Sequence, residues 1–514
     1  MLNLAIIYHM HQPYYKNLLT KESDLPWVRL HGVKDYLDMV QILERFPKIK
    51  LTFNVVPSLF EQIEDYNNAG LEDKYLKLSR KPAEQLTRAD KEFILQNFFS
   101  INKEKVIAFS PRYYQLYFKK KSGQEFNLAD YLDLQVCFNL FWIDPSFRNN
   151  IPELKKVVDK ERFFSEADKQ IVLGQQLEIL KGILPAYKKA QSGKQIEISV
   201  TPYYHPILPL LYDTNIAKEA NKKTVLPKEG FNYPLDAKYQ IDSGVEFYKQ
   251  RFDTQPLGMW PSEEGVSEHI LPYIIESGIK WIVTDEAILF KSLKLKKRNT
   301  KLLYQPHLLK RKEGQLNIVF RDRNLSDLIG FSYSDMKAPD AVNNFMMHLE
   351  NINKAFKGKD TLVTIAMDGE NAWEYFRNDG HDFLDLLYNR ISESEFIKTT
   401  TVSDYLKINP AKRLIKRLSA GSWIYGEFGK WIGNPYKVKA WEWLAQARKS
   451  IAETKNPSDL AWKQMYILEG SDWFWWAGED PDGSFDRLFR LHLTNFYQLI
   501  KQAPPAYLAE PLVP

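Results

Sequence analysis

Short apolar runs of strand length, separated by helical stretches, are the feature that most constrains the fold of this chain. The first run covers residues 2–8, a helical pattern follows at 33–45, and a second run comes at 50–56. This order is typical of a parallel β/α unit, because parallel strands need a crossover connection. Further runs of the same kind return later, at 195–200, 258–260, 280–284, 316–320, 361–367 and 397–402. They predict an α/β fold with a barrel of seven or eight strands, one of the runs being no barrel strand.

Two regions lack this β/α rhythm. Residues 58–190 are helical and charged in pattern, so we expect a helical insertion there. After Ser403 the strand signal disappears, and helical stretches are expected at 412–417, 437–454 and 488–502. We therefore expect a barrel catalytic domain over residues 1–405 and a C-terminal helical domain over 406–514, with Asn409-Pro410 near the boundary.

The amino-acid composition argues against several classes of protein. With 70 basic and 65 acidic residues the net charge is +5, and no long basic arm favours nucleic acid. The single cysteine, Cys137, excludes an internal disulfide and a zinc site built on several cysteines. No apolar stretch is long enough for a membrane span, and the N-terminus reads as a first strand and not as a signal peptide. We expect a cytoplasmic enzyme, and leave its oligomeric state open.

Two acids follow two of the candidate strands. Asp368 comes directly after the run 361–367, and Glu263 follows the run 258–260. Barrels collect their chemistry at the carboxyl ends of strands, so the pair suggests paired-carboxylate catalysis. In glycoside hydrolysis one carboxylate attacks or stabilises the anomeric carbon, and a protonated carboxyl donates to the leaving oxygen.

Several other residues are candidates for substrate binding. His9 and His11 alternate at a strand end and would share one face, because the side-chain period is two. Glu197 interrupts an apolar strand, and an inward carboxylate there must be paired or hydrogen-bonded. Nine of the 13 tryptophans lie between residues 373 and 476, some of them close to Asp472. The remaining candidates of this kind are His205, Trp260, Trp373, Trp423 and Trp475.

Taken together, these segments resemble the family 57 glycoside hydrolases, the second α-amylase family, which acts on α-glucans. Five short motifs occur in order between residues 11 and 476: His11-Gln-Pro13, Glu197 in Gly-x-x-x-Glu-Ile, Trp260-Pro-Ser-Glu263, Asp368-Gly-Glu370 and Ser471–Trp476. The resemblance implies an incomplete (β/α)7 barrel followed by a helical domain, and a retaining mechanism. We expect no cofactor and no metal.

By motif, the resemblance makes Glu263 the nucleophile and Asp368 the general acid/base. It also implies that sugar subsites are lined by His9, His11, Glu197, Trp373, Asp472 and Trp475. The chain departs from the family pattern in having Glu264 directly after Glu263, and adjacent strand residues face opposite sides. The hydrolytic α-amylase-type members are the nearest in pattern, so maltooligosaccharides or longer α-glucans are the expected substrate.

Other functions stay open at this stage. A 4-α-glucanotransferase or an amylopullulanase would use the same scaffold. A metal-dependent deacetylase or mannosidase would place a metal on the pair His9-x-His11, although a catalytic zinc usually takes three protein ligands. A non-catalytic glucan-binding protein is a third class.

Overall fold

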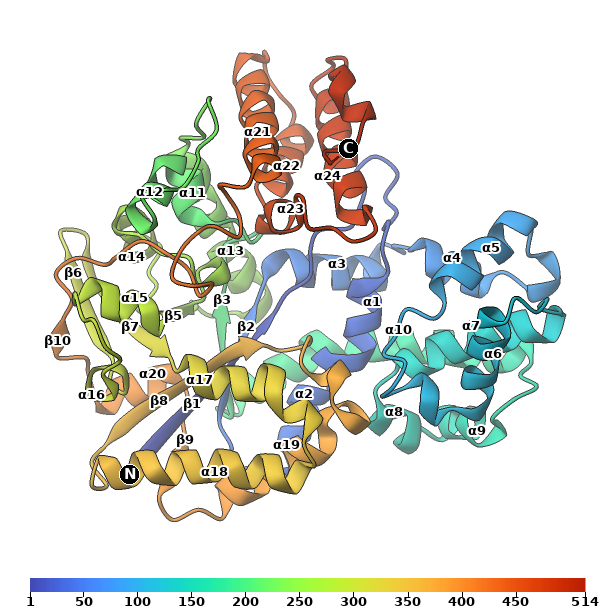
Figure 1. Ribbon diagram of the computed structural model, residues 1–514, viewed down its shortest axis with the longest axis horizontal. Helices are drawn as coiled ribbons and strands as arrows, with labels where there is room; N and C mark the ends of the chain where they lie inside the picture. Colours follow the sequence, from blue (N-terminus) through green and yellow to red (C-terminus); the bar gives the residue numbers. More distant parts are fainter. Residues whose placement is uncertain (514) are drawn as a thin grey trace.

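Ten strands form one mostly parallel sheet in the computed structural model, which describes residues 1–513 (Figure 1). The strands are β1 (Leu2–Met10), β2 (Leu51–Val55), β3 (Ile196–Val200), β4 (Gly258–Met259), β5 (Trp281–Asp285), β6 (His307–Arg311), β7 (Gly314–Arg321), β8 (Thr361–Asp368), β9 (Ile397–Thr399) and β10 (Arg413–Leu414).

Seven of these strands make an incomplete barrel. They run parallel in the order β7-β5-β4-β3-β2-β1-β8. Its two ends, β7 and β8, share no β-ladder within residues 1–513, but the N–H of Asp322 donates to the carbonyl of Thr364 at 2.8 Å. The predicted α/β class and the incomplete seven-stranded barrel are thus confirmed.

The three other strands lie outside the barrel. β9 pairs with the start of β1, below the part of β1 that pairs with β2, so the run 397–402 is the expected one that is no barrel strand. β6 forms an antiparallel hairpin with β7, and β10 pairs with β6. The helix expected at 412–417 is wrong, because Arg413 and Leu414 form that edge strand instead.

Side chains alternate between the inside and the outside of the barrel. In β1, Ala5 and Ile7 belong to a core cluster inside the barrel, whereas Leu4 and Ile6 pack outward against the helices. His9 continues the inward series at the carboxyl end of β1. It is in register with Asn54 of β2 and with Asp368 of β8. The alternation therefore brings polar side chains of three strands to one end of the barrel.

Helices cover the barrel and extend it on two sides. The insertion expected at 58–190 is helical, with α4 to α9 lying to the right in Figure 1. The longer helices are α3 (Pro57–Asn68), α4 (Lys74–Arg80), α5 (Arg88–Asn97), α6 (Pro111–Lys121), α7 (Leu128–Trp142), α8 (Pro145–Asn150), α9 (Pro152–Lys160), α10 (Glu166–Ser192), α13 (Pro234–Phe252), α18 (Ala338–Ala355), α19 (His381–Ser392), α21 (Pro435–Glu453), α22 (Asp459–Leu468) and α24 (Ser484–Leu499). Shorter ones are α1 (Trp27–His31), α2 (Asp38–Gln41), α11 (Leu208–Tyr212), α12 (Ala217–Ala220), α14 (Leu271–Glu276), α15 (Glu286–Ser292), α16 (Thr300–Leu303), α17 (Arg323–Asp327), α20 (Val402–Ile408) and α23 (Ser471–Trp476).

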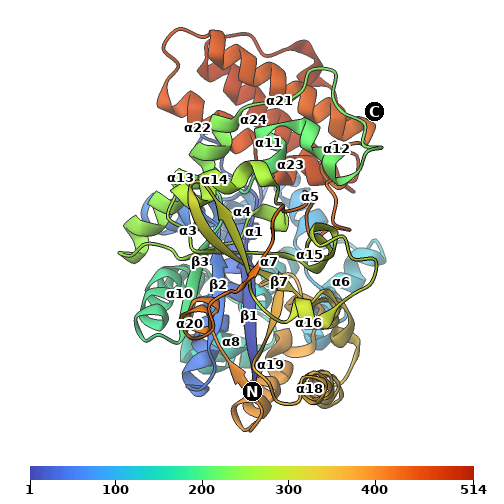
Figure 2. The ribbon, with the colours of Figure 1, turned by 90° about the vertical axis from the view of Figure 1, so that its left-hand side faces the viewer.

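The C-terminal helices lie over the carboxyl ends of the barrel strands. Figure 2 shows α21, α22 and α24 at the top and the start of β1 at the bottom. The chain between α20 and α21 still contacts the barrel, through β10 and through the bridge between Gly421 and Val266. The domain boundary at residues 405 and 406 stays a prediction. No helix within residues 1–513 combines the length and the apolarity needed to cross a membrane.

Candidate active site

Glu263 sits in a strained turn at the end of β4. Its φ is 57°, and the next residue, Glu264, has a φ of 53°. His205, which follows β3, also has a left-handed φ of 57°. Non-glycine residues rarely adopt this conformation, and such strain tends to occur where a site needs a side chain held in one direction. The two strand-to-helix turns after β3 and β4 are therefore shaped to present their side chains.

The carboxylate of Glu263 is held by Trp423, which comes from the segment after the barrel. The indole Nε1–H of Trp423 donates to Oε2 at 2.7 Å, and its backbone N–H donates to the Glu263 carbonyl at 3.1 Å. Gly421 makes this approach possible, because a Cβ there would lie 2.2 Å from the carbonyl oxygen of Gly426. Oε1 of Glu263 is left facing His205, whose Nδ1 lies 3.9 Å away.

Asp368 ends β8 on the inward series of that strand. Asn371 donates from Nδ2 to its Oδ2 at 3.2 Å. The next residue, Gly369, donates its N–H to the carbonyl of His9, and a Cβ at Gly369 would lie 2.4 Å from Sδ of Met10. A glycine is thus needed for the chain to leave β8 close to β1.

The pKa values of both carboxyl groups are raised. Burial raises the pKa of Glu263 to about 8, with the negative charge of Asp368 as the second cause, although the Trp423 hydrogen bond opposes the rise. Burial also raises the pKa of Asp368, against the hydrogen bond from Asn371 and the charges of His11 and Arg321. With Asp368 ionised, Glu263 therefore stays protonated near neutral pH.

Four side chains next to Glu263 form a chain of hydrogen bonds, in the order Asn54, His9, His205 and Ser471. His9 bonds Asn54 Oδ1 through Nδ1 at 2.6 Å and His205 Nε2 through Nε2 at 3.1 Å. Nδ1 of His205 bonds the Ser471 hydroxyl at 2.9 Å. Because the amide oxygen of Asn54 can only accept, His9 carries its proton on Nδ1, and His205 on Nε2. Burial lowers the pKa of His9 to about 3, and that of His205 well below its usual value, so both rings are neutral.

His11 joins the barrel to the C-terminal helices. Its Nε2 lies 2.9 Å from Oδ1 of Asp472, in the first turn of α23. The ring stacks on His205 with a centroid separation of 3.8 Å. The side chains of His11 and Asp472 remain 13% and 14% exposed, and that of Glu263 12%, so solvent reaches these groups.

His11, His205 and Asp472 offer three possible metal ligands whose donor atoms lie within 4.8 Å of one another. However, both ring nitrogens of His205 already bond to His9 and Ser471, so coordination would break one of these bonds. The trio therefore fits hydrogen bonding to a neutral polar ligand better than metal coordination.

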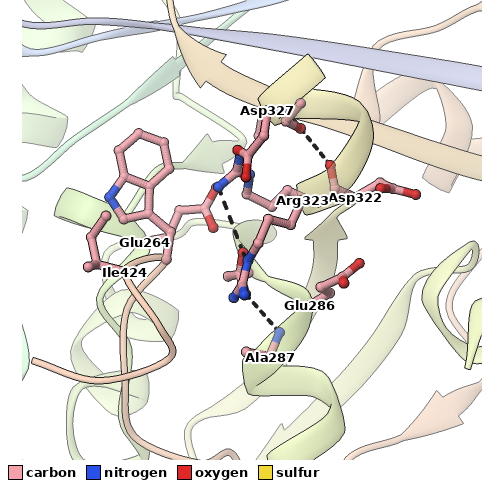
Figure 3. A network of polar contacts seen from close by, with 12 residues as sticks. Glu264, Glu286, Ala287, Asp322, Arg323, Asp327 and Ile424 are labelled. Atoms are coloured by element: carbon pink, nitrogen blue, oxygen red, sulfur yellow. Dashed lines mark hydrogen bonds and ion pairs between the residues drawn. The ribbon is translucent and has the colours of Figure 1, made fainter. Parts of the chain in front are cut away.

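Glu264 points away from Glu263 into a separate network of ions. It is fully buried, and burial raises its pKa well above the usual value, with Arg321 and Arg323 opposing the rise. Figure 3 shows Glu264 at the edge of this network, beside Arg323. Arg323 in turn forms an ion pair with Asp285, which caps α15 by accepting from the Ala287 N–H at 2.8 Å. The departure at residue 264 thus places a second acid behind the site.

Glu370 lies behind Asp368 and is also buried. Its Oε1 accepts from the backbone N–H of His11 at 3.2 Å and from Nε2 of Gln12 at 3.4 Å. Burial, then the charge of Asp368, raises its pKa well above the usual value. A neutral Glu370 braces the loop that carries His11.

The structure does not bring Glu197 to this group. Glu197 is inward, but it is in register with Thr52, two residues below the level of His9 and Asn54. Its carboxylate accepts from Trp281 Nε1 at 2.9 Å and from the Ser403 N–H, at the start of α20, at 3.0 Å. The expectation of a hydrogen-bonded inward carboxylate fits this geometry. These partners belong to the floor of the barrel, so substrate contact is not supported.

The four tryptophan candidates lie at different positions relative to the site. Trp423 contacts Glu263 directly, and Trp260 is buried below the site, where it stacks on His9 at 4.8 Å. Trp475 lies on α23, with the Lys430 ammonium 4.4 Å above its ring. Trp373 does not reach the site: it is 1% exposed and donates from Nε1 to the Gly369 carbonyl at 2.8 Å. It packs on the outer face of the barrel, against Tyr8.

Two neighbours of these residues, Asn54 and Asn371, were not singled out from the sequence. Ser471 was predicted only as part of a motif, and Arg321 only as part of a charged cluster after the run 316–320, with a supporting salt bridge as its expected role. The signal for Asn54 is a polar residue in register with His9, and this register becomes visible only once the strands are paired. Arg321 ends β7, and its guanidinium lies 5.3 Å from the Trp423 ring. Asn54 and Arg321 both lie near the carboxyl ends of barrel strands, where the β/α pattern predicts functional residues.

The fold and the site define an α/β-barrel protein with two buried acids at the carboxyl ends of parallel strands. The family model described as Glycosyl hydrolase family 57 matches residues 5–417. The chain therefore belongs to glycosyl hydrolase family 57, as the sequence motifs predicted. It is 24% identical over 266 residues to Alpha-amylase 1 of Dictyoglomus thermophilum, an alignment that spans 50% of this chain but 32% of that protein.

Solved structures of low sequence identity share the fold over nearly the whole chain. A branching enzyme from Pyrococcus horikoshii matches with a TM-score of 0.62 and 16% identity, over 97% of this chain and 89% of that one. An α-amylase from Thermotoga maritima matches with a TM-score of 0.60 and 14% identity, over 97% and 93%. A 4-α-glucanotransferase from Thermococcus litoralis matches with a TM-score of 0.55 and 15% identity, over 97% and 60%.

Proposed function

We propose that this chain is a retaining glycoside hydrolase acting on α-1,4-glucans, with Glu263 as nucleophile and Asp368 as general acid/base. The observation that carries the proposal is that two acids at the ends of β4 and β8 lie close enough for the charge of Asp368 to raise the pKa of Glu263, which is fixed by an indole. Family membership and the names of the relatives, α-amylase, branching enzyme and glucanotransferase, support an α-glucan as substrate. A cytoplasmic location remains part of the proposal.

The mechanism uses the single proton of the pair. Oε1 of Glu263 attacks the anomeric carbon while Asp368 protonates the leaving oxygen, which gives a covalent glycosyl-enzyme. Attack requires the proton to move from Glu263, whose raised pKa holds it in the free protein, to Asp368. The Trp423 hydrogen bond helps this transfer because it stabilises an ionised Glu263. Forming the ester removes the charge of Glu263, which lowers the pKa of Asp368 and prepares it to deprotonate the incoming water.

Neutral histidines fit the binding of sugar hydroxyls. His11 and Asp472 are partly exposed next to the reacting acids, and together they offer a hydrogen-bond donor and an acceptor. Because His9 and His205 are buried and neutral, they add no positive charge that would oppose an oxocarbenium-like transition state. The proposed subsite therefore consists of His11, Asp472, Trp423 and Trp475, above a floor of His9, His205 and Trp260.

Chemical rescue with azide separates the two roles. We expect Asp368→Ala and Glu263→Gly each to lose nearly all turnover of an aryl α-maltoside, since acid/base assistance alone contributes about 10²–10⁴-fold. With Asp368→Ala, azide should give a glycosyl azide of retained configuration. With Glu263→Gly, it should give the inverted product. Reversed configurations would exchange the two roles, and near-wild-type rates in either variant would rule out the site.

The products from maltoheptaose test the reaction type. Chains shorter than the substrate indicate hydrolysis, whereas longer chains indicate transfer, as in a glucanotransferase. Pullulan cleavage would add α-1,6 activity. The experiment should be repeated after treatment with a chelator, because loss of activity in a chain whose far-UV circular dichroism shows that it stays folded would favour the metal-dependent class. Binding of maltoheptaose without any product would favour a glucan-binding protein.

A further inference from the structure

A second cluster of buried ionisable groups lies outside the barrel and away from the site described above. It is formed by α2, which follows β1, by α8 of the helical insertion, and by α19, which follows β8. These three helices lie next to one another in Figure 1. Their members Asp38, Asp144 and His381 place one donor atom each within 4.8 Å of the others. Asp38 is 6% exposed, Asp144 0% and His381 9%.

Asp38 is the unusual member of this cluster. Its Oδ1 is buried and has no hydrogen-bond partner among residues 1–513. The other two members are already oriented: Oδ1 of Asp144 accepts from the Ser146 N–H at 2.7 Å, and Oδ2 lies 2.8 Å from His381 Nε2. A buried carboxylate without a partner costs free energy unless a cation or a proton compensates it. Protonation alone would not supply an acceptor for the resulting O–H group.

Carboxyl groups outnumber cationic side chains around this cluster. The region holds four carboxyl groups against two cationic side chains, namely Asp35, Asp38, Asp144, Asp379, Lys34 and Arg148. Lys34 is engaged by Asp35 and Asp379, so it does not compensate Asp38 and Asp144. Nδ1 of His31 lies 2.7 Å from Oδ2 of Asp35.

A route from solvent reaches the cluster. A cavity of about 470 Å³ is lined by Asp38 and His381, together with Glu44 and Asp385. The acidic residues of this lining would attract a cation, although Arg45 pairs with Asp385 there. A metal site needs such an entry path in addition to its ligands.

From these observations we propose that Asp38, Asp144 and His381 bind one divalent transition-metal ion, with Zn²⁺ as the expected occupant. Two carboxylate oxygens and one imidazole nitrogen suit Zn²⁺, whereas Ca²⁺ and Mg²⁺ prefer sites built of oxygen alone. Donors around tetrahedral Zn²⁺ are separated by roughly 3.4 Å, so the His381–Asp144 contact needs to open by only about half an ångström. The fourth position would face the cavity.

The ion would have a structural role. It would link the first barrel helix, the helical insertion and the helix after β8, which are far apart in the sequence. Since it binds the folded chain only, it would raise the stability of that chain by mass action.

The test uses the full chain, stripped with a chelator and dialysed against micromolar Zn²⁺. We expect one equivalent of zinc per chain by elemental analysis, and a higher melting temperature with Zn²⁺ than without it. Asp38→Asn and His381→Gln should each lose the bound zinc and the Zn²⁺-dependent thermal shift. Far-UV circular dichroism checks that each variant is folded. The same loss of zinc in both variants would show that the effect does not depend on one particular substitution.

Matched variants at the other trio complete the design. His11→Gln and Asp472→Asn should keep the zinc, because they remove ligands only from the site at the end of the barrel. Zinc lost in these variants and kept in Asp38→Asn would overturn the proposal, as would a stripped wild-type chain that takes up no zinc. Parallel dialysis against Ca²⁺ and Mg²⁺ should give no stoichiometric binding, and a preference for either ion would contradict the ligand assignment.

Discussion

At the scale of single residues, the proposed chemistry depends on whether Glu263 or Asp368 is protonated. Glu263 and Asp368 are both buried acids, and neither has a cationic partner in direct contact among residues 1–513. Their raised pKa values follow from burial and, for Glu263, from the charge on its neighbour. The same arrangement would be costly in a structural role, because two unpaired buried acids destabilise a fold. It is useful where one acid must be ionised while the other donates.

The first prediction concerns pH. The active form of the pair holds one proton, and it loses that proton above the Glu263 pKa of about 8, so kcat/KM should fall at higher pH. On the acid side, a second proton is added above the usual range for aspartate, because the Asp368 pKa is raised. The result should be a bell-shaped profile, measured with an aryl maltoside at constant ionic strength. A rate that stays constant through pH 9 would contradict it.

The second prediction concerns the indole that fixes the nucleophile. Trp423→Phe keeps an aromatic ring but removes the donor to Glu263 Oε2. A hydrogen bond to a charged group is worth about 1.5–3 kcal/mol, so we expect kcat to fall about 10- to 100-fold. The alkaline limb of the pH profile should also shift upward, because the ionised form loses its donor. Trp462→Phe, which removes a tryptophan of α22 instead, should leave both properties unchanged.

At the scale of secondary-structure elements, β3 carries two different functions along its length. Its carboxyl end leads to His205 at the site, whereas Glu197 near its start bonds to β5 and α20. This division explains why an inward carboxylate on a barrel strand does not have to be a substrate ligand. In TIM barrels, residues at the carboxyl ends of the strands carry the chemistry, and residues at the opposite end stabilise the fold.

The third prediction follows for Glu197→Gln. A glutamine presents an NH₂ group to Trp281 Nε1–H or to the Ser403 N–H, so one buried donor loses its acceptor. We expect the free energy of unfolding in urea to fall by about 1–3 kcal/mol, with KM unchanged. Lys398→Gln, an exposed change on β9, serves as the control. A raised KM with unchanged stability would instead restore the expected substrate contact.

The sequence was sufficient for most elements and for part of the site. The barrel strands were predictable because buried parallel strands are apolar runs, and Asp368 and Glu263 follow such runs directly. β6 and β10, the last two strands at one side of the sheet, were missed because they are partly exposed and carry charged residues, as in Leu308–Arg311. Trp373 and Glu197 were placed among the substrate ligands because a motif fixes neither burial nor the level of a side chain along the barrel.

At the scale of the whole molecule, the C-terminal helices complete the site. α23 supplies Asp472 to His11 and Ser471 to His205, and the Ser471 N–H donates to the His205 carbonyl at 3.0 Å. The strained backbone of His205 is therefore held by a segment more than 200 residues later in the chain. Barrel and helices cooperate in one set of hydrogen bonds.

The fourth prediction tests this connection. Ser471→Ala leaves Nδ1 of His205 without its donor in a buried position, so the free energy of unfolding should fall by about 1–3 kcal/mol. Activity should fall as well, since the ring of His205 lies against His11. Ser122→Ala, on the exposed surface of the insertion, should change stability by less than about 0.5 kcal/mol. An unchanged unfolding midpoint in Ser471→Ala would show that the helices attach by other contacts.

The contribution of α23 has a consequence for biosynthesis. A ribosome delivers the barrel strands first, whereas Ser471 and Asp472, the partners of His205 and His11, follow more than 100 residues after the end of β8. A translation product that stops between β8 and α23 would therefore contain both acids but not the groups that align the histidines beside them. The aligned arrangement of His11 and His205 can form only after α23 has been synthesised.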